Sequence, residues 1–140
     1  MNQGPTESFG AEPPSNAGVR FYAAVEDIFF AAKITAAAKR VGVAVEFLRD
    51  ESKLIAAVCS APAVVLVDLN NGGMKTVELV KKLKGSGAPA LQVIGYLSHV
   101  QTELMREAQK AGCDLVLPRS VFSQQLDELL RQRSCHQERC

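Results

Sequence analysis

Acidic residues that directly follow short apolar runs are the residues of this chain best suited to chemistry. Asp68 follows the run AVVLV, and the pair Glu26-Asp27 follows the run FYAAV. A carboxylate at the end of a buried run is costly to place unless another group pairs with it. Ser98 and Arg119 follow later apolar runs in the same way. Carboxylates that converge repel one another and call for a cation between them, and such oxygen ligands favour Mg²⁺.

The elements needed to position these residues are five strands that alternate with five helices. Short Val/Leu-rich runs predict strands buried on both faces, whereas capped, Ala-rich or amphipathic stretches predict helices. The expected strands cover residues 19–25, 43–48, 63–69, 90–97 and 113–117. The expected helices cover residues 28–41, 51–59, 74–84, 98–111 and 120–133, and the fourth of these has Ser98 as its cap.

This alternation with short connections predicts an α/β fold, a doubly wound parallel sheet with helices on both faces. Five units of this length fit the flavodoxin-like strand order 2-1-3-4-5. In that order the carboxyl ends of strands one, three, four and five lie near one another, at the edge where ligands bind. The polar residues after these strands are therefore expected to share one crevice.

Length and composition predict one domain. A chain of 140 residues, 47% of them hydrophobic, can build one full core but not two. The net charge of +1, without a Lys/Arg cluster, argues against nucleic acid as a partner. No apolar run approaches the roughly 20 residues that a membrane-spanning helix needs, and the N-terminus is no secretory signal, so we expect a cytoplasmic protein. The domain should cover 19–133, between disordered tails at 1–18 and 134–140.

Residues 19–133 resemble the receiver domain of two-component response regulators, the CheY-like family. Receiver domains carry an acidic pair after strand one and a phospho-accepting Asp after strand three. Glu26 and Asp27 match the acidic pair, and Asp68 matches the acceptor. Asn70 matches the residue whose backbone carbonyl joins the metal shell. The resemblance therefore implies a Mg²⁺ site formed by Glu26, Asp27, Asp68 and the Asn70 carbonyl.

Two further positions of the family pattern match less closely. Receiver domains have a Lys after strand five, and Arg119 occupies that position when counted from Gly112. Arg and Lys are not equivalent, because a guanidinium is planar and forks two donors, so Arg119 is either a phosphoryl ligand or one half of a locked ion pair with the carboxylates. The family's Ser or Thr after strand four corresponds to Leu97 in a gap-free count and to Ser98 after a one-residue shortening. Ser98 is thus either the switch hydroxyl or only a helix cap.

The resemblance implies a signalling protein rather than an enzyme, with self-phosphorylation from a phosphodonor and acyl-phosphate hydrolysis as its only chemistry. Asp68 would accept the phosphoryl group, and a histidine kinase or a downstream effector would be the protein partner. Only a short tail follows the last helix, so we expect output through protein contacts of the fourth helix, fifth strand and fifth helix, and a homodimer is one such contact. The alternatives are a phosphorylation-independent pseudo-receiver adaptor and a small flavin- or nucleotide-binding flavodoxin-like protein, which the absence of a phosphate-cradling glycine loop disfavours.

Overall fold

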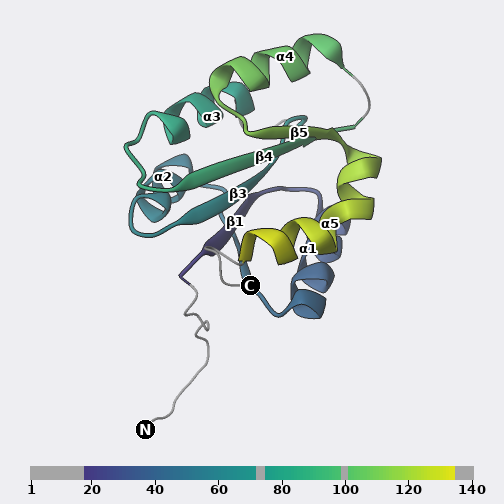
Figure 1. The fold of residues 1–140 in the computed structure, drawn as a ribbon. Helices are drawn as coiled ribbons and strands as arrows, with labels where there is room; N and C mark the ends of the chain where they lie inside the picture. Colours follow the sequence, from purple (N-terminus) through teal and green to yellow (C-terminus); the bar gives the residue numbers. More distant parts are fainter. Residues whose placement is uncertain (1–17, 72–74, 99–100, 135–140) are drawn as a thin grey trace, which may run out of the picture.

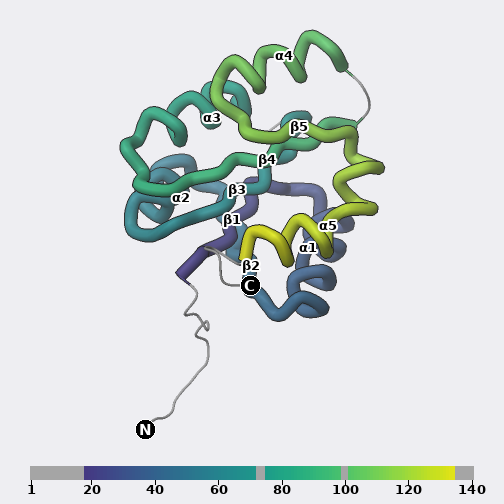
Figure 2. Tube along the Cα trace, viewed as in Figure 1, coloured from purple at the N-terminus to yellow at the C-terminus, as the bar shows by residue number. Residues whose placement is uncertain are grey.

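Five parallel strands form one sheet with the order β2-β1-β3-β4-β5 (Figures 1 and 2). The structure is a computed structural model that describes residues 18–71, 75–98 and 101–134. The strands are β1 (Arg20–Ala24), β2 (Val45–Phe47), β3 (Ala63–Asp68), β4 (Leu91–Leu97) and β5 (Leu115–Pro118). The helices are α1 (Ile28–Val41), α2 (Glu51–Val58), α3 (Thr76–Lys84), α4 (Thr102–Ala111) and α5 (Arg119–Ser134). The expected doubly wound fold and strand order are confirmed.

The helices cover both faces of the sheet. Helices α1 and α5 lie together on one face, and α2, α3 and α4 follow one another across the other (Figure 1). An exposed ion pair links α1 to α5, in which the Arg40 guanidinium donates to both carboxylate oxygens of Asp127 over 2.8 and 2.9 Å. Central strand β3 is buried along its whole length between these layers. Its continuous apolar run is typical of a parallel strand that is covered on both sides.

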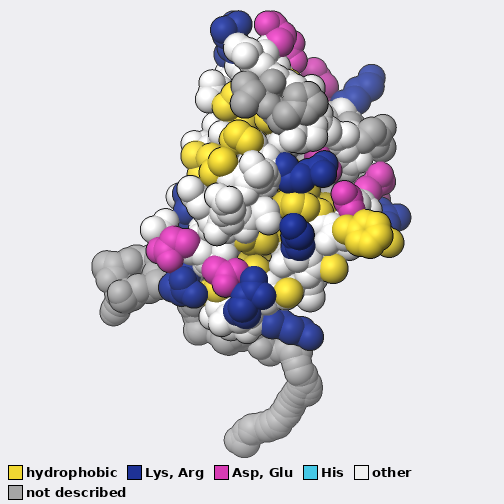
Figure 3. All heavy atoms as spheres, turned by 90° about the vertical axis from the view of Figure 1, so that its right-hand side faces the viewer, with side chains coloured by type: hydrophobic (Ala, Val, Ile, Leu, Met, Phe, Trp, Pro, Cys, Tyr) yellow, Lys and Arg dark blue, Asp and Glu magenta, His cyan; other side chains and the backbone are white. Residues whose placement is uncertain are grey.

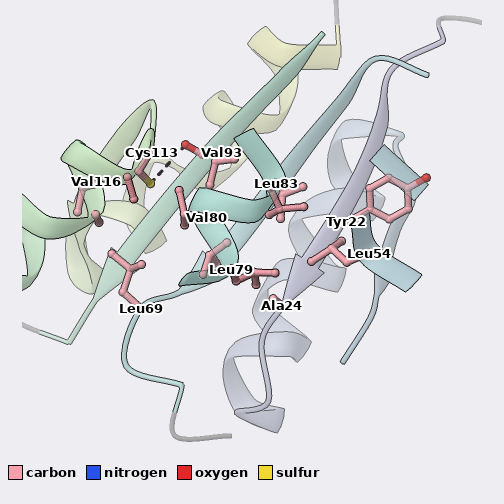
Figure 4. Packing of buried hydrophobic residues seen from close by; sticks show 14 of the residues in the cluster. Tyr22, Ala24, Leu54, Leu69, Leu79, Val80, Leu83, Val93, Cys113 and Val116 are labelled. Atoms are coloured by element: carbon pink, nitrogen blue, oxygen red, sulfur yellow. Dashed lines mark hydrogen bonds between the residues drawn. The ribbon is translucent and has the colours of Figure 1, made fainter. Parts of the chain in front are cut away.

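The core beneath α2, α3 and α4 is mainly aliphatic and also holds Tyr22 (Figure 4). Leucine side chains of two helices are buried there: Leu54 of α2, and Leu79 and Leu83 of α3. They pack against alternate residues of the strands. Gly95 of β4 allows a close approach in this layer, because a Cβ at that position would lie 2.9 Å from Leu69 Cδ1 and 3.1 Å from Cys113 Sγ. The Cys113 thiol is buried here and donates to the carbonyl oxygens of Val93 and Leu115.

The core beneath α1 and α5 is aromatic at the end where the strands finish. The rings of Phe30, Tyr96 and Phe122 come from α1, β4 and α5. Tyr96 lies 4.7 Å from Phe30 and 4.6 Å from Phe122 between ring centroids, and Phe30 lies 5.8 Å from Phe122. All three rings are at least 95% buried, since their exposed fractions are 5%, 0% and 0%. This trio forms an aromatic floor of the core at the carboxyl edge of the sheet.

Several boundaries differ from the sequence-based expectation. Helix α4 begins at Thr102 with Gln101 as its N-cap, so the prediction that Ser98 caps it is wrong. Helix α5 begins at Arg119, directly after Pro118 of β5, which places Arg119 on a helix and not in a loop. Ser134 belongs to α5 and not to the tail, and the rest of the expected tails, apart from Gly18, lies outside the described residues. In the part of the chain that the structure describes, no helix combines the length and the apolarity needed to cross a bilayer.

Candidate functional site

Asp68 is the last residue of β3 and is 6% exposed. Its Oδ1 accepts a hydrogen bond from the backbone N–H of Asn70 over 2.9 Å, which closes a tight turn after the strand. The register of β3 and β4 pairs Asp68 with Tyr96. Paired residues of neighbouring parallel strands point to the same face, so the carboxylate and the phenol both face the layer of α1 and α5. Asp68 is therefore a carboxylate at the carboxyl edge of a central strand, as the sequence predicted.

Burial is the largest influence on the ionisation of this carboxylate. It raises the pKa of Asp68 above its ordinary value, because desolvation disfavours the charged form. The Asn70 N–H and the positive charge of Arg119 act against this rise, and the negative charge of Asp27 adds to it. The net direction is upward, so the local donors compensate the buried charge only in part.

Asp27 occupies the N-cap of α1, where its side chain serves the helix as well as the site. Its Oδ1 accepts from the backbone N–H groups of Phe29 over 2.9 Å and Phe30 over 3.2 Å. An aspartate at this position satisfies donors that have no partner within the helix. The preceding Glu26 is exposed. Of the expected acidic pair, Asp27 is thus electrostatically coupled to Asp68, whereas Glu26 faces solvent at the rim.

Arg119 is near the carboxylates but is not bound to them. Its guanidinium carbon lies 5.6 Å from the centroid of the Phe30 ring, a cation–π arrangement. Among the described residues Arg119 forms no ion pair, although its charge lowers the pKa of Asp68. Its Nε is buried and has no hydrogen-bond partner in the described part of the chain. The alternative of a locked Arg119–Asp68 ion pair is therefore not what the structure forms.

Asn70 links the end of β3 to the segment that leads into α4. Its backbone N–H holds Asp68, its side-chain Oδ1 accepts from the Ser98 backbone N–H over 2.6 Å, and its Nδ2 donates to Gln101 Oε1 over 3.0 Å. The sequence marked only the backbone carbonyl of this residue. Ser98 is exposed beyond the end of β4 and is held through its backbone. One residue thus connects the acceptor candidate, through its backbone, to the start of α4, through its side chain.

Tyr96 is the site residue that the sequence analysis did not identify. It is fully buried, and its hydroxyl oxygen has no hydrogen-bond partner within residues 18–71, 75–98 and 101–134. Burial is the main cause of a raised pKa for Tyr96, and the charges of Asp68 and Arg119 also act on it in opposite directions. The available signal was a polar aromatic residue inside the apolar run VIGYL, but its importance depends on the strand register that pairs it with Asp68.

The donors present fit a divalent cation that is bound mainly through water. Among the described residues no three His, Cys, Asp or Glu side chains form a ready-made metal cluster. Mg²⁺ needs none, since it keeps several waters and commonly uses one or two carboxylates. The Mg²⁺ ion would be held by the Asp68 carboxylate, whose buried charge is compensated only in part. The Asp27 carboxylate oxygen that does not cap α1 and the backbone carbonyl of Asn70 would complete the protein ligands. Glu26, the third carboxylate of the expected set, is exposed and does not complete a three-residue cluster with Asp27 and Asp68 in the described part of the chain.

The end of the molecule where α1 and α5 begin shows a mixed surface (Figure 3). Basic, acidic and hydrophobic side chains all appear on this face. The hydrophobic residues Ile28 and Phe29 at the start of α1 are 71% and 80% exposed, in contrast to Phe30 beside them. Two adjacent large apolar side chains are thus exposed at the start of α1, directly after its N-cap Asp27.

Solved structures of receiver domains have the same fold. A response regulator from Thermotoga maritima matches with a TM-score of 0.68 and 16% identity over 86% of this chain and 99% of that chain. The signal receiver domain of a response regulator from Bermanella marisrubri matches with a TM-score of 0.66 and 16% identity, covering 81% of this chain and 95% of that one. At this identity the likeness shows the fold, and the chain therefore has the fold of response-regulator receiver domains.

A third structure carries ligands at such a fold. The response regulator from Burkholderia pseudomallei with a phosphorylated aspartic acid, calcium ion and citrate matches with a TM-score of 0.61 and 17% identity, over 81% of this chain and 72% of that chain. No protein-family model matches the chain, and no curated protein matches it in sequence. The roles of individual residues in this chain therefore have to be argued from the geometry of the site itself.

Proposed function

We propose that this chain is a receiver-like signalling protein that accepts a phosphoryl group on Asp68 and passes its state on through protein contacts. The observation that carries the proposal is the placement of Asp68 as a buried carboxylate at the carboxyl edge of β3, coupled to the charges of Asp27 and Arg119. The fold shared with receiver domains supports it. The proposal gives the chain no enzymatic activity beyond its own phosphorylation and the hydrolysis of the acyl phosphate.

The chemical step is a nucleophilic displacement at phosphorus. A carboxylate oxygen of Asp68 forms the new P–O bond while the bond from phosphorus to the donor's leaving oxygen breaks, and acetyl phosphate would release acetate. Arg119 turns from Phe30 to donate hydrogen bonds to the phosphoryl oxygens, for which its forked donors are suited. Bound Mg²⁺ would neutralise charge on the transferring group and keep the Asp68 carboxylate ionised.

The state of Asp68 can reach the surface through Asn70. This residue bonds Asp68 with its backbone and the segment before α4 with its side chain. A phosphoryl group or a cation at Asp68 changes the charge that the Asn70 N–H faces, and so biases the position of α4. We propose α4, β5 and α5 as the output surface, with a downstream effector or a second copy of the chain as its partner. A histidine kinase is the proposed phosphodonor, and the cytoplasm is the proposed location.

Intact-mass spectrometry tests the proposal directly. The protein is incubated with acetyl phosphate and Mg²⁺, and we expect a gain of one phosphate that chelation of the metal prevents. Asp68→Asn should abolish the gain, whereas Asp50→Asn, which changes an aspartate that caps α2 away from the site, should leave it intact. A wild type that gains no phosphate, with a stability that does not respond to Mg²⁺, would favour the pseudo-receiver adaptor. A gain that persists in Asp68→Asn would exclude Asp68 as the acceptor.

A further inference from the structure

Two buried polar groups in the neighbourhood of Asp68 have no hydrogen-bond partner among the residues that the structure describes. They are the hydroxyl of Tyr96 and the Nε of Arg119. A buried donor without a partner costs free energy, and each such case in a folded protein calls for an explanation, such as a bound ion or ligand. The charges of Asp68 and Arg119 both influence the pKa of Tyr96, and the charge of Arg119 lowers the pKa of Asp68, so the three side chains share a neighbourhood. Two unsatisfied donors close to one carboxylate indicate a place for an oxyanion.

The position of the Tyr96 ring is fixed by its surroundings. It is stacked between Phe30 and Phe122, at centroid distances of 4.7 and 4.6 Å. The strand register places it on the same face of the sheet as Asp68. A ring held from both sides loses little entropy when its hydroxyl bonds a ligand, because its orientation is already set. Arg119, in turn, lies over the Phe30 ring of the same trio.

We propose that the hydroxyl of Tyr96 is a ligand-binding group of this site and donates a hydrogen bond to an oxyanion carried by Asp68. This inference rests on the proposed function and adds a donor that neither the sequence nor the fold comparison assigns. The phenol is carried by β4 and is buried, whereas Ser98 lies exposed beyond the end of that strand. Tyr96 and Arg119 would then approach the oxyanion together, which accounts for both unsatisfied donors.

Substitution by Phe isolates the hydroxyl. Tyr96→Phe keeps the ring between Phe30 and Phe122 and removes only an oxygen that has no partner in the ligand-free protein. The thermal midpoint of the free variant should therefore equal or exceed that of the wild type. A purely structural role of the hydroxyl would instead lower it. Tyr22→Phe is the matched control, because Tyr22 is also buried but packs in the core beneath the other helices.

The probe is beryllofluoride with Mg²⁺, an analogue of a phosphoryl group on a carboxylate, bound to the full chain. Binding is followed by tyrosine fluorescence, since the chain has two tyrosines and no tryptophan. In Tyr22→Phe the emission of Tyr96 should change on binding, with an affinity like that of the wild type measured by calorimetry. In Tyr96→Phe the affinity measured by calorimetry should fall about ten-fold, as for the loss of a hydrogen bond to a charged group.

The outcomes separate this inference from the proposed function. Equal affinities of wild type and Tyr96→Phe, or an unchanged emission in Tyr22→Phe, would overturn the role of the hydroxyl and leave Asp68 as the acceptor. No binding to the wild type, or binding that survives Asp68→Asn, would overturn the proposed function and the inference with it. A reduced affinity in Tyr96→Phe with an unchanged thermal midpoint of the free protein supports the role of the hydroxyl.

Discussion

At the scale of single residues, the site is defined by a carboxylate that the fold does not fully compensate. Asp68 is buried, and the donors that act on it are one backbone N–H and the charge of an arginine that stacks elsewhere. Natural proteins retain a buried, incompletely paired charge where a bound ion or ligand supplies the missing interaction. The two residue-scale predictions therefore concern the cost of Asp68 and the position of Arg119.

Asp68→Asn should stabilise the metal-free protein at neutral pH. Burial raises the pKa of Asp68 above its ordinary value of 3.8, so the folded state binds a proton more tightly than the unfolded state. The ionised carboxylate therefore destabilises the fold above its folded pKa, and this penalty vanishes below the unfolded value. We expect a gain on the order of 1 kcal/mol near pH 7 that shrinks toward about pH 4.

Thermal unfolding of both proteins across that pH range measures the difference. Asp50→Asn provides the control, because Asp50 caps α2 and Asn serves equally well at such a position. A gain that grows as the pH falls would contradict the argument, since it would mean that folding favours the ionised form of Asp68.

Phe30→Leu should weaken Mg²⁺ binding by releasing Arg119. The Phe30 ring attracts the guanidinium, and a cation–π contact of this kind contributes roughly 0.5–2 kcal/mol. Without the ring, Arg119 is free to pair with Asp68 and compete with the cation. The matched control is Phe122→Leu, which removes another ring of the same trio but not the one against which Arg119 lies.

Calorimetric titration with Mg²⁺ compares the two variants. We expect a lower affinity in Phe30→Leu and a nearly unchanged affinity in Phe122→Leu. Equal losses in both variants would attribute the effect to general loosening of the aromatic core instead of to the position of Arg119.

At the scale of elements, β4 connects the two cores at the point where the site forms. Its successive residues alternate between the layers, so Tyr96 reaches the aromatic floor while Gly95 and Leu97 face the aliphatic side. The register with β3 then places Gly95 opposite Val67 and Tyr96 opposite Asp68. The close packing at Gly95 thus helps to fix the strand on which the phenol is carried.

Gly95→Ala should destabilise the fold by about 1–3 kcal/mol. The added Cβ would lie 2.9 Å from Leu69 Cδ1 and 3.1 Å from Cys113 Sγ, and both contacts are with buried side chains. Chemical unfolding measures the loss. In a double-mutant cycle with Leu69→Ala, the effect of Gly95→Ala should become smaller, because the nearest obstacle is gone. Strict additivity of the two changes would show that the contact with Leu69 is not the cause.

At the scale of the whole molecule, the sequence predicted the architecture better than the site. Alternating apolar runs and capped helices were enough for the fold and for the full extent of α1, because burial on both faces of a parallel sheet leaves an unmistakable pattern. The positions of Asp68 at the end of β3 and of Asp27 just after β1 agree with the apolar runs, whereas their role in a metal or phosphoryl site stays a prediction. The contact of Arg119 with the Phe30 ring depends on the direction of the arginine side chain. The pairing of Tyr96 with Asp68 depends on the register between β4 and β3. Neither feature can be deduced from a local sequence pattern.

Mg²⁺ should stabilise the whole domain through this one site. A ligand that binds only the folded state raises the free energy of unfolding by about 2.7 kcal/mol at one hundred times its dissociation constant. The carboxylates of Asp27 and Asp68 come together only through the packing of β1, β3 and α1, so the unfolded chain offers no equivalent site. Thermal unfolding with and without Mg²⁺ should show the rise, and a chelator should reverse it. Asp68→Asn should remove most of the response and Asp50→Asn none of it, and an equal response in Asp68→Asn would place the cation elsewhere on the molecule.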